Sequence, residues 1–184
     1  MEFEEKTIKS ELIYDGKVTK YIVEDVLLPN GKQSKREIVR HDGAAAIIAF
    51  TDDQKLLLVK QYRKAIEKIS IEIPAGLKDA EYENGLKTAK RELEEETGFQ
   101  AQVWSFITSF YSTPGFTDEF LEIYEARQLI KVDNPLPKDE DETIEVLALT
   151  FEEAWHAYEE GHLRDSKSVF ALFYWKMKKI QGFN

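Results

Sequence analysis

The stretch RELEEETGF, Arg91–Phe99, contains four glutamates among its nine residues. Glu92 and Glu96 are four positions apart, so in a helix they lie one turn apart on one face, where like charges repel. Carboxylate oxygens in this arrangement suit a hard divalent cation, since Mg²⁺ is commonly held by one or two carboxylates together with substrate phosphates. The spacing leaves two interpretations open, a metal site and an ordinary solvated acidic face.

The residues that flank this stretch predict that it ends a helix. Asn84 is a suitable N-cap, and Gly98 stands where a glycine commonly follows the last helical residue. At about 100° per residue, Leu86, Ala89 and Leu93 share one face, with the glutamates on an adjacent face. We therefore expect a helix between Asn84 and Gly98 that packs its apolar face on the core and leaves its carboxylates beside it.

Strand signals surround the predicted helix. Residues 1–42 alternate polar and apolar side chains, and the pairs Asp15-Gly16 and Asn30-Gly31 are typical of hairpin turns. The run GAAAIIAF, residues 43–50, predicts a strand buried on both faces. Further strands are predicted at 55–63, 69–76, 102–111, 119–127 and 143–149.

Two helices are predicted after the last strand. Thr150 and Glu153 form a capping-box pattern for the first, and the second begins near Asp165. We expect the second helix to bury Val169, Leu172, Phe173 and Met177. The elements together predict an α+β fold, with a small N-terminal antiparallel β-domain at 1–42 and a larger domain at 43–184.

Composition limits the partners of the chain. Its 184 residues are 42% hydrophobic, enough for a packed core, and its formal net charge of −10 argues against a surface that coats nucleic acid. The chain has no cysteine, no signal-peptide pattern at its start and no apolar run of about 18 residues that could span a bilayer. We expect a cytoplasmic protein with neither a nucleic acid nor a membrane as its partner.

Residues 76–99, GLKDAEYENGLKTAKRELEEETGF, resemble the Nudix box. In that pattern a glycine, five residues, a glutamate and seven residues precede Arg-Glu-aliphatic-X-Glu-Glu-X-Gly-aliphatic. The spacing fits from Glu83 onward, whereas six residues separate Gly76 from Glu83, which we interpret as a one-residue loop insertion; Phe99 takes the last aliphatic position. The resemblance implies the Nudix fold, a mixed β-sheet sandwiched between helices, and a supporting role for Glu83.

The resemblance also implies roles for the helix carboxylates. Glu92 and Glu96 would bind Mg²⁺, with Mn²⁺ as an alternative, and the Ala75 carbonyl would add a backbone ligand. Glu95 would assist, and Arg91 would orient the carboxylates by a salt bridge. The reaction implied is hydrolysis of a nucleoside diphosphate linked to another group, with a metal ion polarising the phosphorus and a carboxylate taking a proton from water.

Further stretches resemble the ADP-ribose pyrophosphatases of this family. In FYSTPGFTDE, residues 110–119, the resemblance places Pro114, Gly115 and Glu119 near the substrate, although the local sequence alone indicates only a Pro-Gly turn. Matching arginines, Arg36 in KREIVRHDG and Arg63 in VKQYRK, would reach the diphosphate and ribose, for which a planar guanidinium is suited. Each arginine alone could equally be a surface residue.

Two more acidic positions follow from the same resemblance. Glu72 lies close to the metal-facing loop and would contact water or substrate. In PLPKDEDETIEV, residues 135–146, a loop of this subfamily supplies the general base; Glu140 is our first choice and Glu142 the second. Read alone, this loop is a solvated turn.

We therefore predict a Mg²⁺-dependent hydrolase that converts ADP-ribose, a small-molecule nucleoside diphosphate sugar, to AMP and ribose 5-phosphate. Residues 1–42 resemble the domain that pairs across a homodimer in this subfamily, which would bring Arg36 to the partner's pocket. One alternative is a pyrophosphatase for another nucleotide sugar, such as GDP-mannose. The other is an inactive nucleotide-binding Nudix module, which would usually lack glutamates that are all present here.

Overall fold

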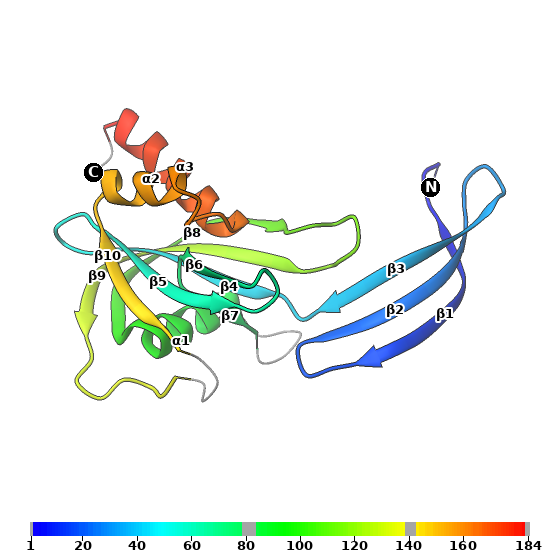
Figure 1. Cartoon of the computed structure of the whole chain (residues 1–184), viewed down its shortest axis with the longest axis horizontal. Coiled ribbons are helices and arrows are strands. Elements are labelled where there is room, and N and C mark those ends of the chain that lie inside the picture. The colour runs from blue at the N-terminus through cyan, green and yellow to red at the C-terminus, as the bar shows by residue number, and fades with distance from the viewer. Residues whose placement is uncertain (1, 79–83, 139–142, 183–184) are drawn as a thin grey trace.

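The structure, a computed structural model, describes residues 2–78, 84–138 and 143–182, and contains two separate β-sheets (Figure 1). The first sheet is antiparallel in the order β1-β2-β3 and has β1 at its edge. Its strands are β1 (Lys6–Asp15), β2 (Thr19–Leu27) and β3 (Gln33–His41). Its turns fall at the two glycine pairs that the sequence marked, which confirms the predicted N-terminal antiparallel sheet.

The second sheet has seven strands and forms the body of the molecule. Five follow the order β10-β5-β4-β9-β8, while β6 pairs with β5 and β7 with β4. Because β4 and β9 are parallel and the other pairs antiparallel, the sheet is mixed. Its strands are β4 (Ala44–Phe50), β5 (Leu56–Arg63), β6 (Lys68–Glu72), β7 (Ala75–Leu77), β8 (Phe99–Tyr111), β9 (Phe120–Lys131) and β10 (Glu145–Leu149).

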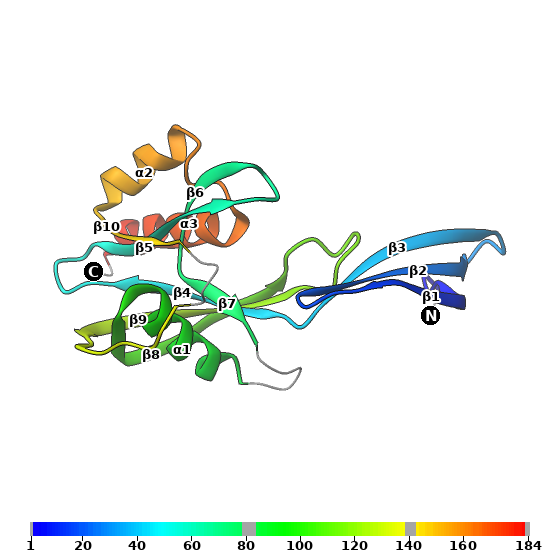
Figure 2. The ribbon, with the colours of Figure 1, turned by 60° about the horizontal axis from the view of Figure 1, so that its bottom comes forward.

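Helices cover both faces of this sheet (Figure 2). One face carries α1 (Gly85–Thr97), and the other carries α2 (Phe151–Glu159) and α3 (Ser166–Ile180). Neighbouring residues of β4 point to opposite faces, so Ile47 packs in the cluster under α1 and Ile48 in the cluster under α3. Every residue of β4 is consequently buried, and the predicted sandwich of a mixed sheet between helices is confirmed.

Helix α1 begins and ends where the sequence predicts. The Asn84 side chain accepts a hydrogen bond from the Leu86 amide, as an N-cap does. At the other end Gly98 adopts a left-handed conformation with φ of 73°, which a residue with a Cβ rarely does. The sharp exit at Gly98 leads the chain directly into β8 and fixes the position of the last helical turn, which carries Glu96.

The loop before β9 fastens the N-terminal sheet to the body. The Val39 amide donates a hydrogen bond of 2.8 Å to the Phe116 carbonyl. Asp118 accepts a 2.9 Å hydrogen bond from the His41 amide and pairs with Arg40 at 3.0 Å. The end of β3 is therefore held by the same loop that contains the Pro-Gly pair.

Helix α3 differs from our expectation in the face that it buries. Leu172 is fully buried, but Phe173 and Met177 are 42% and 60% exposed, so the prediction was wrong for these two residues. The buried positions are Ser168, Ala171, Leu172 and Trp175. Steps of three and four residues define this face, whereas Phe173 lies further round the helix and packs on Trp155 of α2.

Truncation of α3 tests this orientation. Leu172→Ala should lower the free energy of unfolding by about 2–5 kcal/mol, because it opens a cavity in a packed core. Met177→Ala on the same helix should change it by no more than about 0.5 kcal/mol, since the side chain is largely in water. Urea unfolding followed by circular dichroism measures both values, and similar losses for the two variants would contradict the orientation.

Candidate active site

The last turns of α1 present Glu92 and Glu95 beside Arg91. The Nη1 atom of Arg91 lies 2.7 Å from a carboxylate oxygen of Glu92 and 2.7 Å from one of Glu95. Its Nη2 atom donates a 2.8 Å hydrogen bond to the Leu77 carbonyl on β7. One guanidinium thus offsets the repulsion between two carboxylates and fastens α1 to β7. The catalytic roles of Glu95 and Arg91 stay predictions.

Glu96 is buried at the start of β7. Its Oε2 atom accepts a 3.0 Å hydrogen bond from the Ala75 amide. Ala75 in turn pairs with Ala46 of the central strand β4. The sheet therefore sets Ala75, the predicted backbone ligand, next to Glu96, a predicted carboxylate ligand.

Gly76 makes room for the other predicted ligand. A Cβ atom built on Gly76 would lie 1.9 Å from the carboxylate carbon of Glu92, so that carboxylate rests directly on the backbone of β7. A side chain at position 76 would therefore displace the Glu92 carboxylate, even though the loop after Gly76 is one residue longer than the Nudix pattern. Glu83, at the end of that loop, lies outside the described residues.

This donor set fits a hard divalent cation. Glu92 and Glu96 contribute carboxylate oxygens around the Ala75–Gly76 backbone, which offers carbonyl oxygen as well. Within residues 2–78, 84–138 and 143–182, no three or more acidic, histidine or cysteine side chains are already gathered as a metal site. A cation held by two carboxylates and completed by substrate phosphates and water, as is usual for Mg²⁺, is consistent with both observations.

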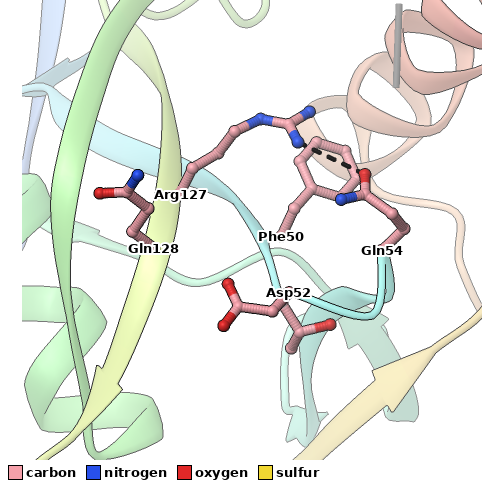
Figure 3. Close-up of a pocket in the computed structure, with 6 residues that line it drawn as sticks. Phe50, Asp52, Gln54, Arg127 and Gln128 are labelled. Carbon is pink, nitrogen blue, oxygen red and sulfur yellow. Dashed lines mark hydrogen bonds between the residues drawn. The ribbon is translucent and has the colours of Figure 1, made fainter.

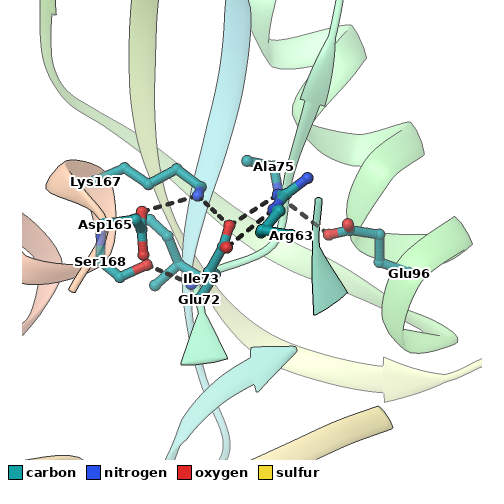
Figure 4. A network of polar contacts seen from close by, with 8 residues as sticks. All are labelled: Arg63, Glu72, Ile73, Ala75, Glu96, Asp165, Lys167 and Ser168. Carbon is teal, nitrogen blue, oxygen red and sulfur yellow. Dashed lines mark hydrogen bonds and ion pairs between the residues drawn. The ribbon is translucent and has the colours of Figure 1, made fainter. Parts of the chain in front are cut away.

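Glu72 is a buried carboxylate with two cations on it (Figure 4). Arg63 donates to it through Nε at 2.9 Å and Nη2 at 2.8 Å, and Lys167 Nζ lies 2.6 Å from Oε2. Burial would raise the pKa of Glu72, but the two cations outweigh burial and lower this pKa to about 2. The structure therefore shows Glu72 as the counter-ion of Arg63, and a direct contact of Glu72 with substrate stays a prediction.

The sequence analysis missed the residues of α3 that reach this cluster. Lys167 is also 2.8 Å from Asp165, and the Ser168 hydroxyl accepts a 2.8 Å hydrogen bond from the Ile73 amide. A lysine in the first turn of a helix opposes the helix dipole, which favours anions there. The unfavourable position of Lys167 in the sequence therefore indicated that a carboxylate elsewhere in the fold pairs with it.

A second group of predicted residues lines a hollow of 310 Å³ between β3 and the loop before β9. Arg36, Pro114 and Gly115 all lie on its wall. Arg36 is paired with Glu5 at 2.5 Å, which is another wall residue. Among the described residues, no hydrogen bond or ion pair joins Arg36 to the carboxylates of α1, and no residue of α1 lines this hollow.

The remaining predicted positions have separate outcomes. Glu119 lies at the end of the same loop, where it accepts a hydrogen bond from the Ser112 hydroxyl and lies 3.8 Å from His41. Glu140 and Glu142, the two choices for the general base, lie outside the described residues. Their role is therefore untested by the geometry.

Another hollow, of 180 Å³, lies at the opposite end of β4 (Figure 3). Its wall includes Phe50, Asp52 and Arg127, and the Arg127 guanidinium stacks 4.8 Å from the centre of the Phe50 ring. Arg127 is also paired with Glu125 at 2.7 Å. This hollow contains none of the predicted site residues, and its arginine is already paired with a carboxylate.

Comparisons with known proteins agree with this arrangement. A family profile described as "NUDIX domain" matches residues 39–172. A "Methanol dehydrogenase activator" from Bacillus methanolicus is 48% identical over 177 residues, which cover 96% of this chain and 95% of the relative. An "ADP-ribose pyrophosphatase" from Bacillus subtilis (strain 168) is 47% identical over 176 residues, again 96% of this chain and 95% of the relative.

A solved structure shares the fold along almost the whole chain. It is described as "Crystal structure of ADP compounds hydrolase" and superposes with a TM-score of 0.84 at 23% sequence identity. The match covers 98% of this chain and 97% of that chain, so both the N-terminal sheet and the body have counterparts there. No described helix is long and apolar enough to cross a membrane.

The lowered pKa of Glu72 predicts a loss of stability in acid. The unfolded chain takes up this proton near pH 4.5 and the folded chain only near pH 2, so stability is complete above pH 4.5 and declines below it. Over the whole interval the loss is on the order of 3 kcal/mol. Urea unfolding between pH 6 and pH 3 should show this slope in the wild type and a shallower slope in Glu72→Gln. Glu145→Gln, which removes an exposed carboxylate, is the control and should keep the wild-type slope.

The contact between Gly76 and Glu92 predicts that Gly76→Ala weakens metal binding. The added methyl group must displace the Glu92 carboxylate, and changes of this kind cost about tenfold or more in metal affinity. Calorimetric titration with Mn²⁺ measures the effect, and the urea midpoint checks that the fold is kept. Gly115→Ala, where a methyl group would meet no atom within 4 Å, should leave the metal affinity unchanged. Equal affinity of wild type and Gly76→Ala for Mn²⁺ would contradict the placement of Glu92.

Proposed function

Because the chain belongs to the Nudix family, we propose that it hydrolyses the pyrophosphate bond of ADP-ribose and releases AMP and ribose 5-phosphate. The observation that carries this proposal is the meeting of Glu92 and Glu96 at the Ala75–Gly76 backbone, with Arg63 near Ala75 and Glu96 (Figure 4). The substrate is supported by the Bacillus subtilis relative, which aligns with 96% of this chain. The name of the Bacillus methanolicus relative describes an effect on another enzyme and is compatible with the same hydrolysis.

The side chains divide the work as follows. Glu92, Glu96 and the Ala75 carbonyl would hold Mg²⁺, or Mn²⁺ in its place, and Arg91 keeps the helix carboxylates oriented. When bound, the metal ion neutralises the diphosphate and lowers the pKa of a coordinated water. A carboxylate takes a proton from the attacking water while the oxygen of that water bonds to phosphorus. The bond between this phosphorus and the bridging oxygen then breaks. Glu140 or Glu142 is our proposal for this base.

We also infer a homodimer that pairs through the N-terminal sheet. Every residue of the edge strand β1 is exposed, including large apolar side chains, and exposed edge strands of this kind favour pairing with another chain. These apolar side chains are Ile8, Leu12, Ile13 and Tyr14. In such a dimer Arg36 would serve the partner's pocket, as the resemblance implies, and its ion pair with Glu5 just before β1 links it to the edge of the sheet. The division into domains at 1–42 and 43–184 and a cytoplasmic location stay predictions.

The first test is an analysis of products. The protein is incubated with ADP-ribose, ADP-glucose, GDP-mannose and a nucleoside triphosphate, each with Mg²⁺ and with chelator, and nucleotides are separated. We expect AMP to form fastest from ADP-ribose and only with metal. Faster release of GMP from GDP-mannose would favour the nucleotide-sugar alternative, and no turnover of any compound would favour an inactive binding module.

Substitutions on α1 test the predicted metal ligands. Glu92→Gln and Glu96→Gln should each lower kcat by about a hundredfold or more, since each removes a charged ligand while keeping its shape. Glu94→Gln is the matched control, because Glu94 lies on the same helix but accepts hydrogen bonds from Gln100 and the Leu136 amide. The assignment fails if Glu94→Gln is as slow as the other two variants at saturating Mg²⁺.

A further inference from the structure

The two counter-ions of Glu72 differ in their surroundings. The Lys167 side chain is 12% exposed and is also held by Asp165 at the start of α3. The Arg63 side chain, at the end of β5, is 43% exposed, whereas Glu72 itself is only 3% exposed. One buried carboxylate therefore has an enclosed cation on one side and a cation open to solvent on the other.

Arg63 lies on the side of Glu72 that faces the predicted metal ligands. Figure 4 shows its guanidinium next to the hydrogen bond between Ala75 and Glu96. Its pKa is raised first by the hydrogen bonds to Glu72 and also by the charge of Glu96. Within the described part of the chain, Arg63 makes no ion pair other than that with Glu72. An anion bound at the helix carboxylates through a cation would therefore meet this guanidinium.

A buried carboxylate that loses its only cation is strongly destabilised, because it keeps the cost of desolvation without compensation. If Arg63 were the sole partner of Glu72, it could not turn toward a substrate without that cost. Lys167 removes this obstacle, since its Nζ atom lies 2.6 Å from Oε2 of Glu72 and Asp165 holds it in place. Glu72 thus contacts two cations, of which Lys167 is shared with Asp165 and Arg63 is not.

We propose that Lys167 is a positioning residue that remains on Glu72 and thereby frees Arg63 to exchange this carboxylate for the diphosphate of the substrate. The proposal rests on the proposed function, because it takes a nucleoside diphosphate as the anion. A guanidinium binds two phosphate oxygens in the same forked geometry that it uses here on Glu72. Glu72 therefore keeps at least one cation both with and without bound diphosphate.

The test compares variants in steady-state kinetics with ADP-ribose and in calorimetric binding of inorganic pyrophosphate with Mg²⁺. Lys167→Met should raise KM and the dissociation constant of pyrophosphate about ten- to hundredfold, since Arg63 must then stay on Glu72. The effect on kcat should be smaller than the effect on KM. Binding of pyrophosphate measures the diphosphate contact without the adenosine and ribose groups.

The decisive comparison is between Glu72→Gln and the double variant that also carries Lys167→Met. With the carboxylate gone, Arg63 has lost its ion pair, so adding Lys167→Met to Glu72→Gln should leave KM and pyrophosphate affinity the same as in Glu72→Gln alone. This comparison keeps the test valid if Lys167→Met alone fails to fold. An additional tenfold loss when Lys167→Met is added to Glu72→Gln would overturn the proposal.

Lys178→Met is the matched control. Lys178 also lies on α3 and pairs at 2.9 Å with a buried strand carboxylate, Glu125, which Arg127 contacts as well. Its removal should lower the urea midpoint but leave KM unchanged. Equal increases of KM in Lys167→Met and Lys178→Met would show a general effect of α3 and overturn the proposal.

The use of both ADP-ribose and inorganic pyrophosphate distinguishes a failure of this proposal from a failure of the proposed function. A wild type that does not hydrolyse ADP-ribose but binds pyrophosphate refutes the substrate, and the pyrophosphate affinities of the variants still decide the role of Lys167. A wild type that binds neither ligand overturns both proposals.

Discussion

The burial of β4 along its whole length is the constraint on which the rest of the structure depends. A strand that is apolar on both faces needs a layer of helices on each side, so α1 and α3 must lie on opposite faces of the sheet. The segment from Glu72 to Gly76 passes between these layers. There the Pro74 carbonyl accepts a 2.8 Å hydrogen bond from the Ile47 amide of β4.

Both helical layers hold this same short segment. From one face, α3 reaches Glu72 through Lys167 and the Ile73 amide through Ser168. From the other, α1 reaches the Ala75 amide through Glu96, and the Glu92 carboxylate rests on the next residue. The candidate site therefore lies where two helices and the central strand fix one stretch of backbone, which limits how far its ligand oxygens can move.

The charge distribution explains how an acidic chain can bind an anionic substrate. The formal net charge is −10, yet cations contact the carboxylates of the site, with Arg91 on Glu92 and Glu95, and Arg63 with Lys167 on Glu72. At physiological ionic strength the field of distant charges is screened beyond about 8 Å. A diphosphate would therefore encounter the nearby guanidinium and a bound cation more strongly than the general negative charge.

Elements with local signals were predictable from the order of the amino acids. Such signals depend on neighbouring residues or on a repeat of a few residues. They are the caps Asn84 and Gly98, the glycine pairs of the N-terminal hairpins, the apolar run of β4 and the spacing of Glu92 and Glu96. These features predicted the helix, the central strand and the N-terminal sheet, whereas the resemblance to the Nudix box implied the mixed sheet between helices and the metal-binding roles of the glutamates.

Contacts between residues far apart in the chain became apparent only in the folded molecule. The pairing of Lys167 with Glu72 joins residues 95 positions apart, and the close approach to the backbone of Gly76 comes from Glu92, a side chain of another element. The buried face of α3 was likewise misread at Phe173, because α2 supplies an aromatic surface that covers this residue outside the core. Such contacts depend on how layers pack, and no local pattern in the sequence encodes that packing.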